Sequence, residues 1–322
     1  MPGPTAALTT LRPDLGGSFL EFDLAMQASG FIGAQALPVI TSAKQTGPFG
    51  KIPVEQLLQS PDTSRAPGSG YSRGHFTFST DTFAPEEHGW EEPVDDREAQ
   101  MYSDYFDAEQ IATARAMGFV LRAAEERAAS LLFNASTWTP TAVTNEWDDY
   151  ANATPVQDVE AAVQRVYAAS GLWANTLIVS RKVFRNLRMT DEVRNRISSS
   201  GAGSPSRASD VTVDMLATVF DLPKILVGGG TKNTANPGAA ATLDGIWDDE
   251  YAMVAKTADT SDIREPCVGR IIHWQEDGSE IDGRVETYRD ETIRSDVVRV
   301  RHDVDEKVLY TEAAGLLSNI TA

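Results

Sequence analysis

The sequence predicts an α+β fold in which a long irregular N-terminal region precedes a helical middle and a strand-rich C-terminal part. Ten of the 16 prolines lie at or before Pro93, and proline breaks helices, so the first 93 residues cannot form a compact helical domain. Residues 95–132 contain no proline, and apolar residues recur there at the three- and four-residue steps of a helix. From Gly269 onward, apolar and polar residues alternate as they do in strands.

Length and composition bound the possible functions. The chain has 322 residues, 47 acidic and 28 basic side chains, and a net charge of −19. This charge argues against a nucleic-acid binder or a membrane-surface protein that depends on a general positive field. A hydrophobic content of 41% is enough for packed cores, and the single cysteine, Cys267, excludes a disulfide framework. No secretory signal and no run of about 18 apolar residues is present, so we expect a soluble protein from a reducing compartment.

The first 93 residues divide into an arm, 1–37, and an extended loop, 38–93. Within the loop, Phe76-Thr77-Phe78-Ser79 alternates as a half-solvated strand does, and Pro67-Gly68-Ser69-Gly70 just before it predicts a turn. These features predict a long two-stranded ribbon. Because an isolated two-stranded hairpin is marginally stable in water, we expect the ribbon to lie on a surface outside itself.

The next segment predicts a helix from about Asp104 to Leu132, about 40 Å long at 1.5 Å per residue, which suits a structural spine. Its apolar face comprises Met117, Val120, Leu121, Ala124, Ala128, Leu131 and Leu132. We place on the opposite, solvated face Arg115, Arg122, Glu125, Glu126 and Arg127.

A second unit begins near Thr154, where Thr154-Pro155-Val156-Gln157 predicts a capping box at the start of a helix that Gly171 ends. The apolar stripe of this helix comprises Val156, Val159, Val163, Val166 and Tyr167. A buried strand over 176–179 follows, then two short helices capped by Ser180 and Thr190. Further on we expect a helix over 213–220, strands over 224–227 and 251–255, and loops over 198–209 and 233–241.

The C-terminal part predicts a mainly antiparallel sheet. Its expected strands cover 270–274, 283–288, 297–301 and 308–310. Val298 and Val300 alternate with Arg299 and Arg301, which indicates that the sheet has one buried face.

The sequence carries no recognisable catalytic or cofactor-binding motif, so we assign no catalytic, cofactor-binding or metal-ligating residue. The glycine run 228–230 before Thr231-Lys232 lacks the spacing of a phosphate loop. The four histidines are far apart in sequence, and Cys267 is interpreted as a buried small hydrophobe. The acidic run 248–250 offers carboxylates for a metal, although neighbouring positions rarely point the same way, and a solvated turn is the preferred interpretation.

Four groups of residues occur in a distinctive order. First, Val94-Asp95-Asp96 leads into Phe106-Asp107-Ala108-Glu109 and the long helix. A strand-then-helix pattern over 175–187 follows, and then a helix-then-strand pattern over 216–227. The last group, which resembles a closing sheet, comprises Ile246-Trp247, Gly269, Tyr288 and 308–316. In this order the sequence resembles the major capsid proteins of tailed phages with the HK97-type fold. The resemblance covers roughly residues 18–319 and depends on the order of these patterns, not on one diagnostic motif.

The resemblance implies an HK97-like capsid fold in four parts: an N-terminal arm (1–37), an extended loop (38–93), a peripheral domain with the long spine helix (94–153 and 266–322), and an axial domain (154–265). It implies a structural, non-enzymatic subunit that self-assembles as pentamers and hexamers into the icosahedral shell around a tailed phage's double-stranded DNA. The implied location is the virion, after assembly in the host bacterial cytoplasm.

The resemblance also implies partners. In this family the extended loop lies over a neighbouring subunit, and we choose as candidate inter-subunit contacts Arg65, Arg73, Phe76, Phe78, Trp90 and Arg299. Because the recognisable arm begins almost at the N-terminus, we expect a separate scaffolding protein, with a portal and a possible cement protein. DNA is expected to be enclosed without sequence-specific binding, and no membrane is implied.

Two other functions stay open at this point. A bacterial nanocompartment shell of the encapsulin kind would have the same fold and would enclose a cargo enzyme. An acidic cytosolic metal-dependent enzyme would use Asp248, Asp249 or Glu250. Packaged DNA would favour the phage shell, a cargo protein the compartment, and stoichiometric binding of a divalent metal the enzyme.

Overall fold

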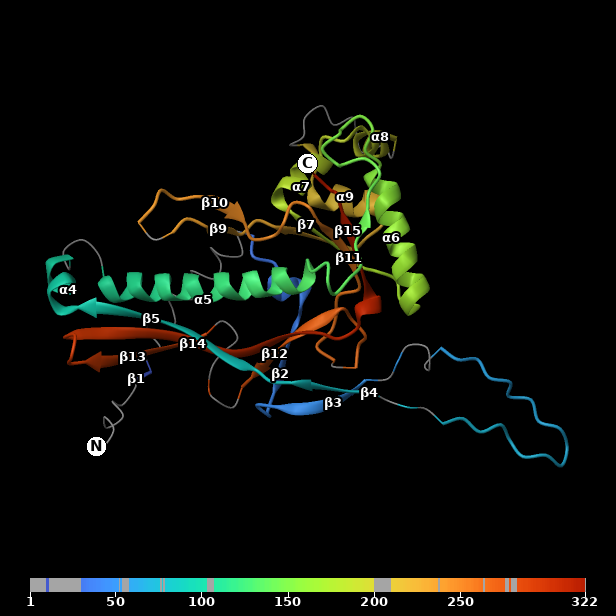
Figure 1. Cartoon of the computed structure of the whole chain (residues 1–322), viewed down its shortest axis with the longest axis horizontal. Helices are drawn as coiled ribbons and strands as arrows, with labels where there is room; N and C mark the ends of the chain where they lie inside the picture. The colour runs from blue at the N-terminus through green and yellow to red at the C-terminus, as the bar shows by residue number, and fades with distance from the viewer. Residues whose placement is uncertain are drawn as a thin grey trace.

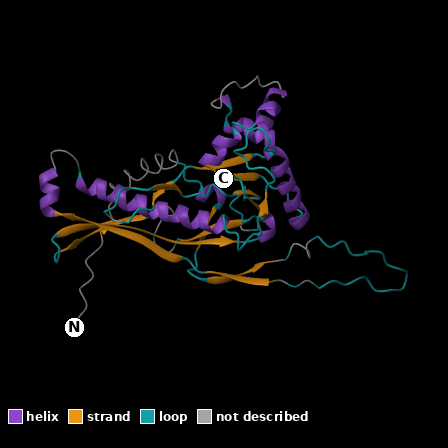
Figure 2. Ribbon diagram, turned by 45° about the horizontal axis from the view of Figure 1, so that its top comes forward, coloured by secondary structure: helices purple, strands orange, loops and turns teal. Residues whose placement is uncertain are grey.

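Two β-sheets and a long helix organise the chain (Figure 1). The computed structural model describes residues 10–11, 30–51, 53, 58–75, 77, 79–102, 107–199, 210–236, 238–262, 264–275, 278 and 283–321. Helices pack on both sheets, and a long loop projects away from the body as coil beyond a short two-stranded base (Figure 2). The mixture of helices and sheets confirms the predicted α+β class.

The larger sheet is built around one long strand, β14 (Ser295–Val308). Antiparallel partners of β14 are β12 (Gly269–Trp274), β13 (Arg284–Asp290) and β5 (Glu86–Asp95). The sheet is completed by β2 (Val39–Ser42), parallel to β12, and by β1 (Thr10–Leu11), antiparallel to β13. Val298 and Val300 are fully buried, so the prediction of one buried face is confirmed.

The sequence prediction of two strands over 297–301 and 308–310 is wrong, because β14 runs without interruption through the polar stretch between them. Asp303 and Asp305 have the composition of a turn, yet each pairs in register with a residue distant in sequence, Glu87 on β5 and Ile272 on β12. Long-range pairing therefore overrides the local preference of these residues.

The spine helix α5 (Ala108–Leu132) packs against β5 and β14 (Figure 1). Its 25 residues extend about 37 Å. The Asp107 side chain caps the first turn by accepting hydrogen bonds from the backbone N–H groups of Glu109 and Gln110. A short helix, α4 (Asp96–Tyr102), precedes it. Met117, Val120, Ala128 and Leu132 are buried as predicted.

The second sheet has the strand order β6 (Thr141–Ala142), β15 (Ala314–Ser318), β11 (Ala252–Ala255), β7 (Thr176–Ser180) and β8 (Lys224–Gly228). Around it pack α6 (Pro155–Ser170), α7 (Arg181–Leu187), α8 (Asp191–Ser199) and α9 (Val213–Phe220). The predicted helix over 213–220 is confirmed. Ser180 caps α7 by accepting from Val183 N, as predicted, and Gly171 ends α6 in the left-handed conformation.

The predicted capping box at Thr154 does not form. The Thr154 side chain makes no capping hydrogen bond; instead the Glu192 carboxylate, at the start of α8, accepts from Val156 N at 2.9 Å and from Gln157 Nε2 at 3.3 Å. The anionic side chain that satisfies the N-terminus of α6 therefore comes from another helix, which local sequence could not indicate.

The predicted loop over 233–241 lies at the end of a small hairpin, β9 (Thr231–Asn233) paired with β10 (Leu243–Gly245). The hairpin extends from the five-stranded sheet over α5 (Figure 1). Gly228, just before it, must be glycine, because an added Cβ would stand 2.3 Å from Cδ1 of the buried Trp247.

A charged cluster fixes the segment that returns from the five-stranded to the six-stranded sheet. The Asp259 carboxylate accepts hydrogen bonds from Lys224 Nζ and from Lys256 Nζ, each at 2.6 Å. These two ammonium groups lower the pKa of Asp259 to about 2. Lys256 Nζ also lies 3.3 Å from Glu265. The fully buried Arg270 donates to the carbonyls of Thr260 and Asp262. The cluster thus joins β8 to the segment leading into β12.

Candidate assembly surfaces

The extended loop is attached to the body by a two-stranded hairpin. Strands β3 (Gly47–Lys51) and β4 (Ser79–Phe83) pair antiparallel, so the base of the predicted ribbon is confirmed. Three contacts tie this base to the six-stranded sheet: Lys307 Nζ to Asp81 at 3.0 Å, Ala84 N to the Asp305 carboxylate at 3.0 Å, and Lys51 Nζ 4.5 Å from the centre of the Tyr310 ring.

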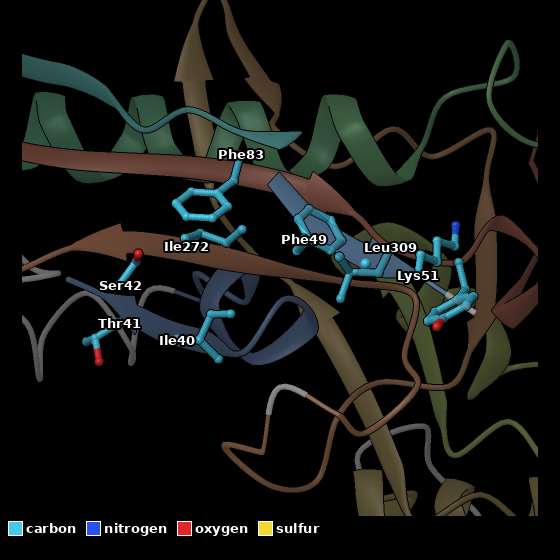
Figure 3. Close-up of a pocket in the computed structure, with 10 residues that line it drawn as sticks. Ile40, Thr41, Ser42, Phe49, Lys51, Phe83, Ile272 and Leu309 are labelled. Atoms are coloured by element: carbon cyan, nitrogen blue, oxygen red, sulfur yellow. The ribbon is translucent and has the colours of Figure 1, made fainter. Parts of the chain in front are cut away.

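An apolar pocket of about 140 Å³ lies between this hairpin and the sheet (Figure 3). Phe49 and Phe83 line it from the hairpin, and Ile40 and Ile272 line it from β2 and β12. Lys51 lies at one end (Figure 3). The root of the loop is therefore held against the sheet by contacts on both sides of this apolar pocket.

Residues 58–75 of the loop are exposed throughout and have no regular secondary structure, so the prediction of a long ribbon is wrong beyond its base: without a surface to lie on, the outer part forms no strand pairing. Arg65 donates to the Ser69 carbonyl at 2.7 Å and its guanidinium stands over the Tyr71 ring at 4.7 Å. Tyr71 is 72% exposed, and Arg73 is exposed as well. Phe76 and Phe78 lie outside the described residues. The described hydrogen bonds and ring contacts of residues 59–75, which include the predicted turn at Pro67 and Gly68, are all made to other residues of the loop.

The two remaining candidate contacts lie on the six-stranded sheet. Trp90 on β5 is 47% exposed and packs on Phe119 of α5, with ring centres 4.9 Å apart. Arg299 on β14 donates to Glu91 at 2.6 Å and stacks on the Tyr288 ring at 5.0 Å. Both residues thus already have partners in their own chain, and Arg299 is the less available of the two for a neighbouring subunit.

Glu125 joins three separate parts of the chain, and its predicted place on the solvated face of the helix is wrong. Only 4% of it is exposed. Its carboxylate accepts hydrogen bonds from Ile32 N at 2.8 Å, from Gly33 N at 2.7 Å and from Trp247 Nε1 at 2.6 Å. Burial raises the pKa of Glu125, and these three bonds act in the opposite direction. One carboxylate therefore connects the spine helix to the start of α2 (Gly33–Ala36) and to the segment after β10.

A second polar cluster joins the spine helix to the sheet. His88 on β5 pairs in register with the buried His302 on β14, and their ring centres are 6.0 Å apart. Arg127 on α5 reaches His302 Nε2 at 3.5 Å and forms an ion pair with Glu306 at 2.9 Å. Burial, and then the Arg127 charge, lower the pKa of His88.

The acidic run 248–250 serves the fold. Asp249 accepts from Ser180 Oγ at 2.5 Å, Asp248 accepts from Glu250 N, and Glu250 accepts from Asn319 N. Among the described residues, no group of three or more histidine, cysteine, aspartate or glutamate side chains could hold a metal ion. In the same part of the chain, no helix combines the length and apolar character needed to cross a membrane.

An exposed aromatic pair marks the end of α6. Tyr167 and Trp173 stack with ring centres 4.2 Å apart and planes 16° from parallel, and they are 44% and 61% exposed. The prediction that Tyr167 belongs to the buried stripe is therefore wrong. Its helical spacing places it on the apolar face of α6, but it lies in the last turn of the helix and packs on Trp173, outside the core. Gly171, which lies between these two aromatic residues in the sequence, is next to the Leu58 side chain of the extended loop.

Comparisons with known proteins agree with this architecture. No protein-family model matches the chain. The chain is 22% identical to a major capsid protein of Pseudomonas phage JBD67 over 229 residues, which are 70% of this chain and 71% of that protein. A phage-related protein from Bordetella bronchiseptica RB50 has a similar structure, with a TM-score of 0.69 at 18% identity, covering 97% of this chain and 98% of that one. The mature capsid of bacteriophage PhiM1 gives 0.52 at 14% identity, covering 87% and 83%.

The fold is therefore the HK97-type capsid fold, and the class predicted from the sequence is confirmed. Within that class, the relative found by sequence is a phage major capsid protein and the PhiM1 structure is a phage capsid, so the predicted resemblance is confirmed too. The comparisons support a structural capsid role and not an enzymatic one.

Proposed function

We propose that the chain is the shell subunit of a tailed phage capsid, assembling with copies of itself into an icosahedral container for double-stranded DNA. The observation that carries the proposal is the extended loop. Residues 59–75 project from the body, and their described polar contacts are internal to the loop. A projecting exposed loop with Tyr71 and two arginines is suited to contact a neighbouring molecule.

The parts of the subunit have distinct places in this proposal. Residues 1–37 act as the arm, and the extended loop, 38–93, reaches a neighbour through its projecting middle part, while its two ends form β2 and most of β5 in the six-stranded sheet. Residues 94–153 and 266–322 form the peripheral domain, and 154–265 form the axial domain around the fivefold and sixfold axes. Each contact can be weak, because a subunit bound to several neighbours gains avidity and the symmetry closes the shell.

The proposed partners follow from the same role. Copies of the chain form pentamers and hexamers, a separate scaffolding protein guides assembly in the host cytoplasm, and a portal and a cement protein complete the virion. The net charge of −19 suits a container that should not bind its DNA tightly. Arg65, Arg73, Phe76, Phe78 and Trp90 are the proposed inter-subunit contacts, with Arg299 the weakest candidate.

Light scattering after size exclusion, with negative-stain images of the peak, tests this proposal. The chain is expressed alone and with its neighbouring scaffold gene product, and hollow particles of megadalton mass are expected in at least one case. Double-stranded DNA in particles from infected cells supports the phage shell, and an enzyme cargo instead would indicate a nanocompartment. A stable monomer or dimer under both conditions would contradict an assembly role.

A further inference from the structure

We propose that Leu58, Tyr167 and Trp173 form one half of a contact between neighbouring copies of this chain, and that the exposed basic side of α7 forms the other half. We call these surfaces the aromatic patch (Leu58, Tyr167, Trp173) and the basic face (Arg181, Lys182, Arg185). The inference rests on the proposed shell function, to which it adds a specific pair of surfaces.

The aromatic patch has the character of an unfilled interface. Trp173 and Tyr167 stack on each other but keep 61% and 44% of their surfaces exposed, and Leu58 beside them keeps 64%. The patch is assembled from two distant segments, because Leu58 contacts Gly171 at the end of α6. Tryptophan and tyrosine are the residues most enriched among those that dominate binding energy at interfaces.

The basic face presents cations suited to aromatic rings. Arg181, Lys182 and Arg185 are exposed on one short helix whose other side, Val183, Phe184 and Leu187, is buried. Lys182 lies 3.7 Å from Asp249, a distant ion pair. Arg181 and Arg185 make no ion pair with any other described residue. A planar guanidinium stacks well on the face of tryptophan or tyrosine.

The two surfaces cannot meet within one chain. Helices α6 and α7 contribute to the same hydrophobic core on one face of the five-stranded sheet. The two surfaces nevertheless lie apart, because Trp173 precedes β7 and Arg181 follows it, at opposite ends of that five-residue strand. Two different, separated surfaces of a subunit form a head-to-tail contact when one copy's surface meets the other surface of the next copy, and such contacts close into a ring when the rotation is fivefold or sixfold. A second copy of the chain is therefore the occupant that fits both halves.

Substitutions on each half test the pairing. Trp173→Ala and the double variant Arg181→Glu/Arg185→Glu should each raise the critical concentration for assembly, followed by light scattering, roughly tenfold. The urea midpoint of unassembled subunits should stay unchanged for Arg181→Glu/Arg185→Glu, whose side chains are exposed, and should fall only slightly for Trp173→Ala, which loses its stacking on Tyr167. Ile293→Ala, another exposed apolar position, is the matched control and should assemble normally. Normal assembly of either test variant would overturn the proposal.

Crosslinking identifies the partner surface directly. The single native cysteine, Cys267, is buried, so introduced cysteines can be modified selectively. In assembled shells, Trp173→Cys/Arg185→Cys treated with a short bismaleimide should give a ladder ending at five or six subunits, and neither single variant should. A ladder from Trp173→Cys alone, or none from the double variant in intact shells, would refute the pairing. Failure of the wild-type chain to form any shell would instead refute the proposed function.

Discussion

Glu125 is the residue whose loss should damage the subunit most. Glu125→Ala would leave the backbone N–H groups of Ile32 and Gly33 and the Trp247 indole N–H without their acceptor in a buried site. Unsatisfied buried donors are costly, so we expect the free energy of unfolding to fall by roughly 2–5 kcal/mol. Urea denaturation of unassembled subunits measures this fall.

The conservative variant separates the hydrogen bonds from the packing. Glu125→Gln keeps the shape and one carbonyl acceptor but turns an NH₂ group toward one of the donors, so its stability should lie between those of the wild type and Glu125→Ala. Equal stability of all three proteins would show that the three hydrogen bonds contribute little.

The burial of Glu125 could have been predicted from its helical spacing, although its charge suggests an exposed position. It lies three residues before Ala128 and seven before Leu132, so it belongs at the edge of the apolar stripe. Arg127 lies at the other edge and pairs with Glu306 on the sheet. Both residues were predicted on the solvated face of the helix because they are charged. The partners that allow their burial are distant in sequence.

At the scale of elements, the contact between the spine helix and the sheet should respond to pH. The folded state lowers the pKa of His88 below its ordinary value of 6.5. As the pH falls below about 6.5, the unfolded chain takes up a proton there and the folded chain does not, so the free energy of unfolding decreases until the pH reaches the folded pKa. Above pH 6.5 both states are neutral at His88 and the effect vanishes.

Two histidine variants isolate this contribution. Comparing urea midpoints at pH 7.5 and 5.5, we expect His88→Gln to lose less stability on acidification than the wild type does. The difference between the two proteins reports the contribution of His88 itself. His75→Gln, in the exposed loop, should behave like the wild type. Identical pH dependence of the His88 variant and the wild type would exclude His88 as a sensor.

Elements with strong local signals were predictable, and those defined by distant partners were not. The helix over 213–220 has a cap at Thr212 and a clear apolar pattern, and it forms as predicted. Strand β14 and the N-terminus of α6 depend on β5, β12 and Glu192, which lie far away in sequence. Likewise, the exposed aromatic and arginine surfaces could not be recognised before the elements that carry them were placed in space.

At the scale of the whole molecule, folding and assembly should be separable. The subunit core closes without the outer part of the extended loop, because residues 59–75 are exposed and their described contacts are local. Strands β3 and β4 end at Lys51 and Ser79. Replacing residues 60–75 with Gly-Ser-Gly therefore leaves the hairpin, its pocket and Leu58 in place.

We expect this loop-shortened subunit to unfold at the wild-type urea midpoint and to form no shells, because it lacks the reach to a neighbour. Shell formation is measured by light scattering and negative-stain imaging, as for the intact chain. Replacing residues 234–242 of the β9–β10 hairpin by the same linker is a control for shortening an exposed loop. A destabilised loop variant would mean that the loop belongs to the folding core, and normal shells would remove the loop from the assembly mechanism.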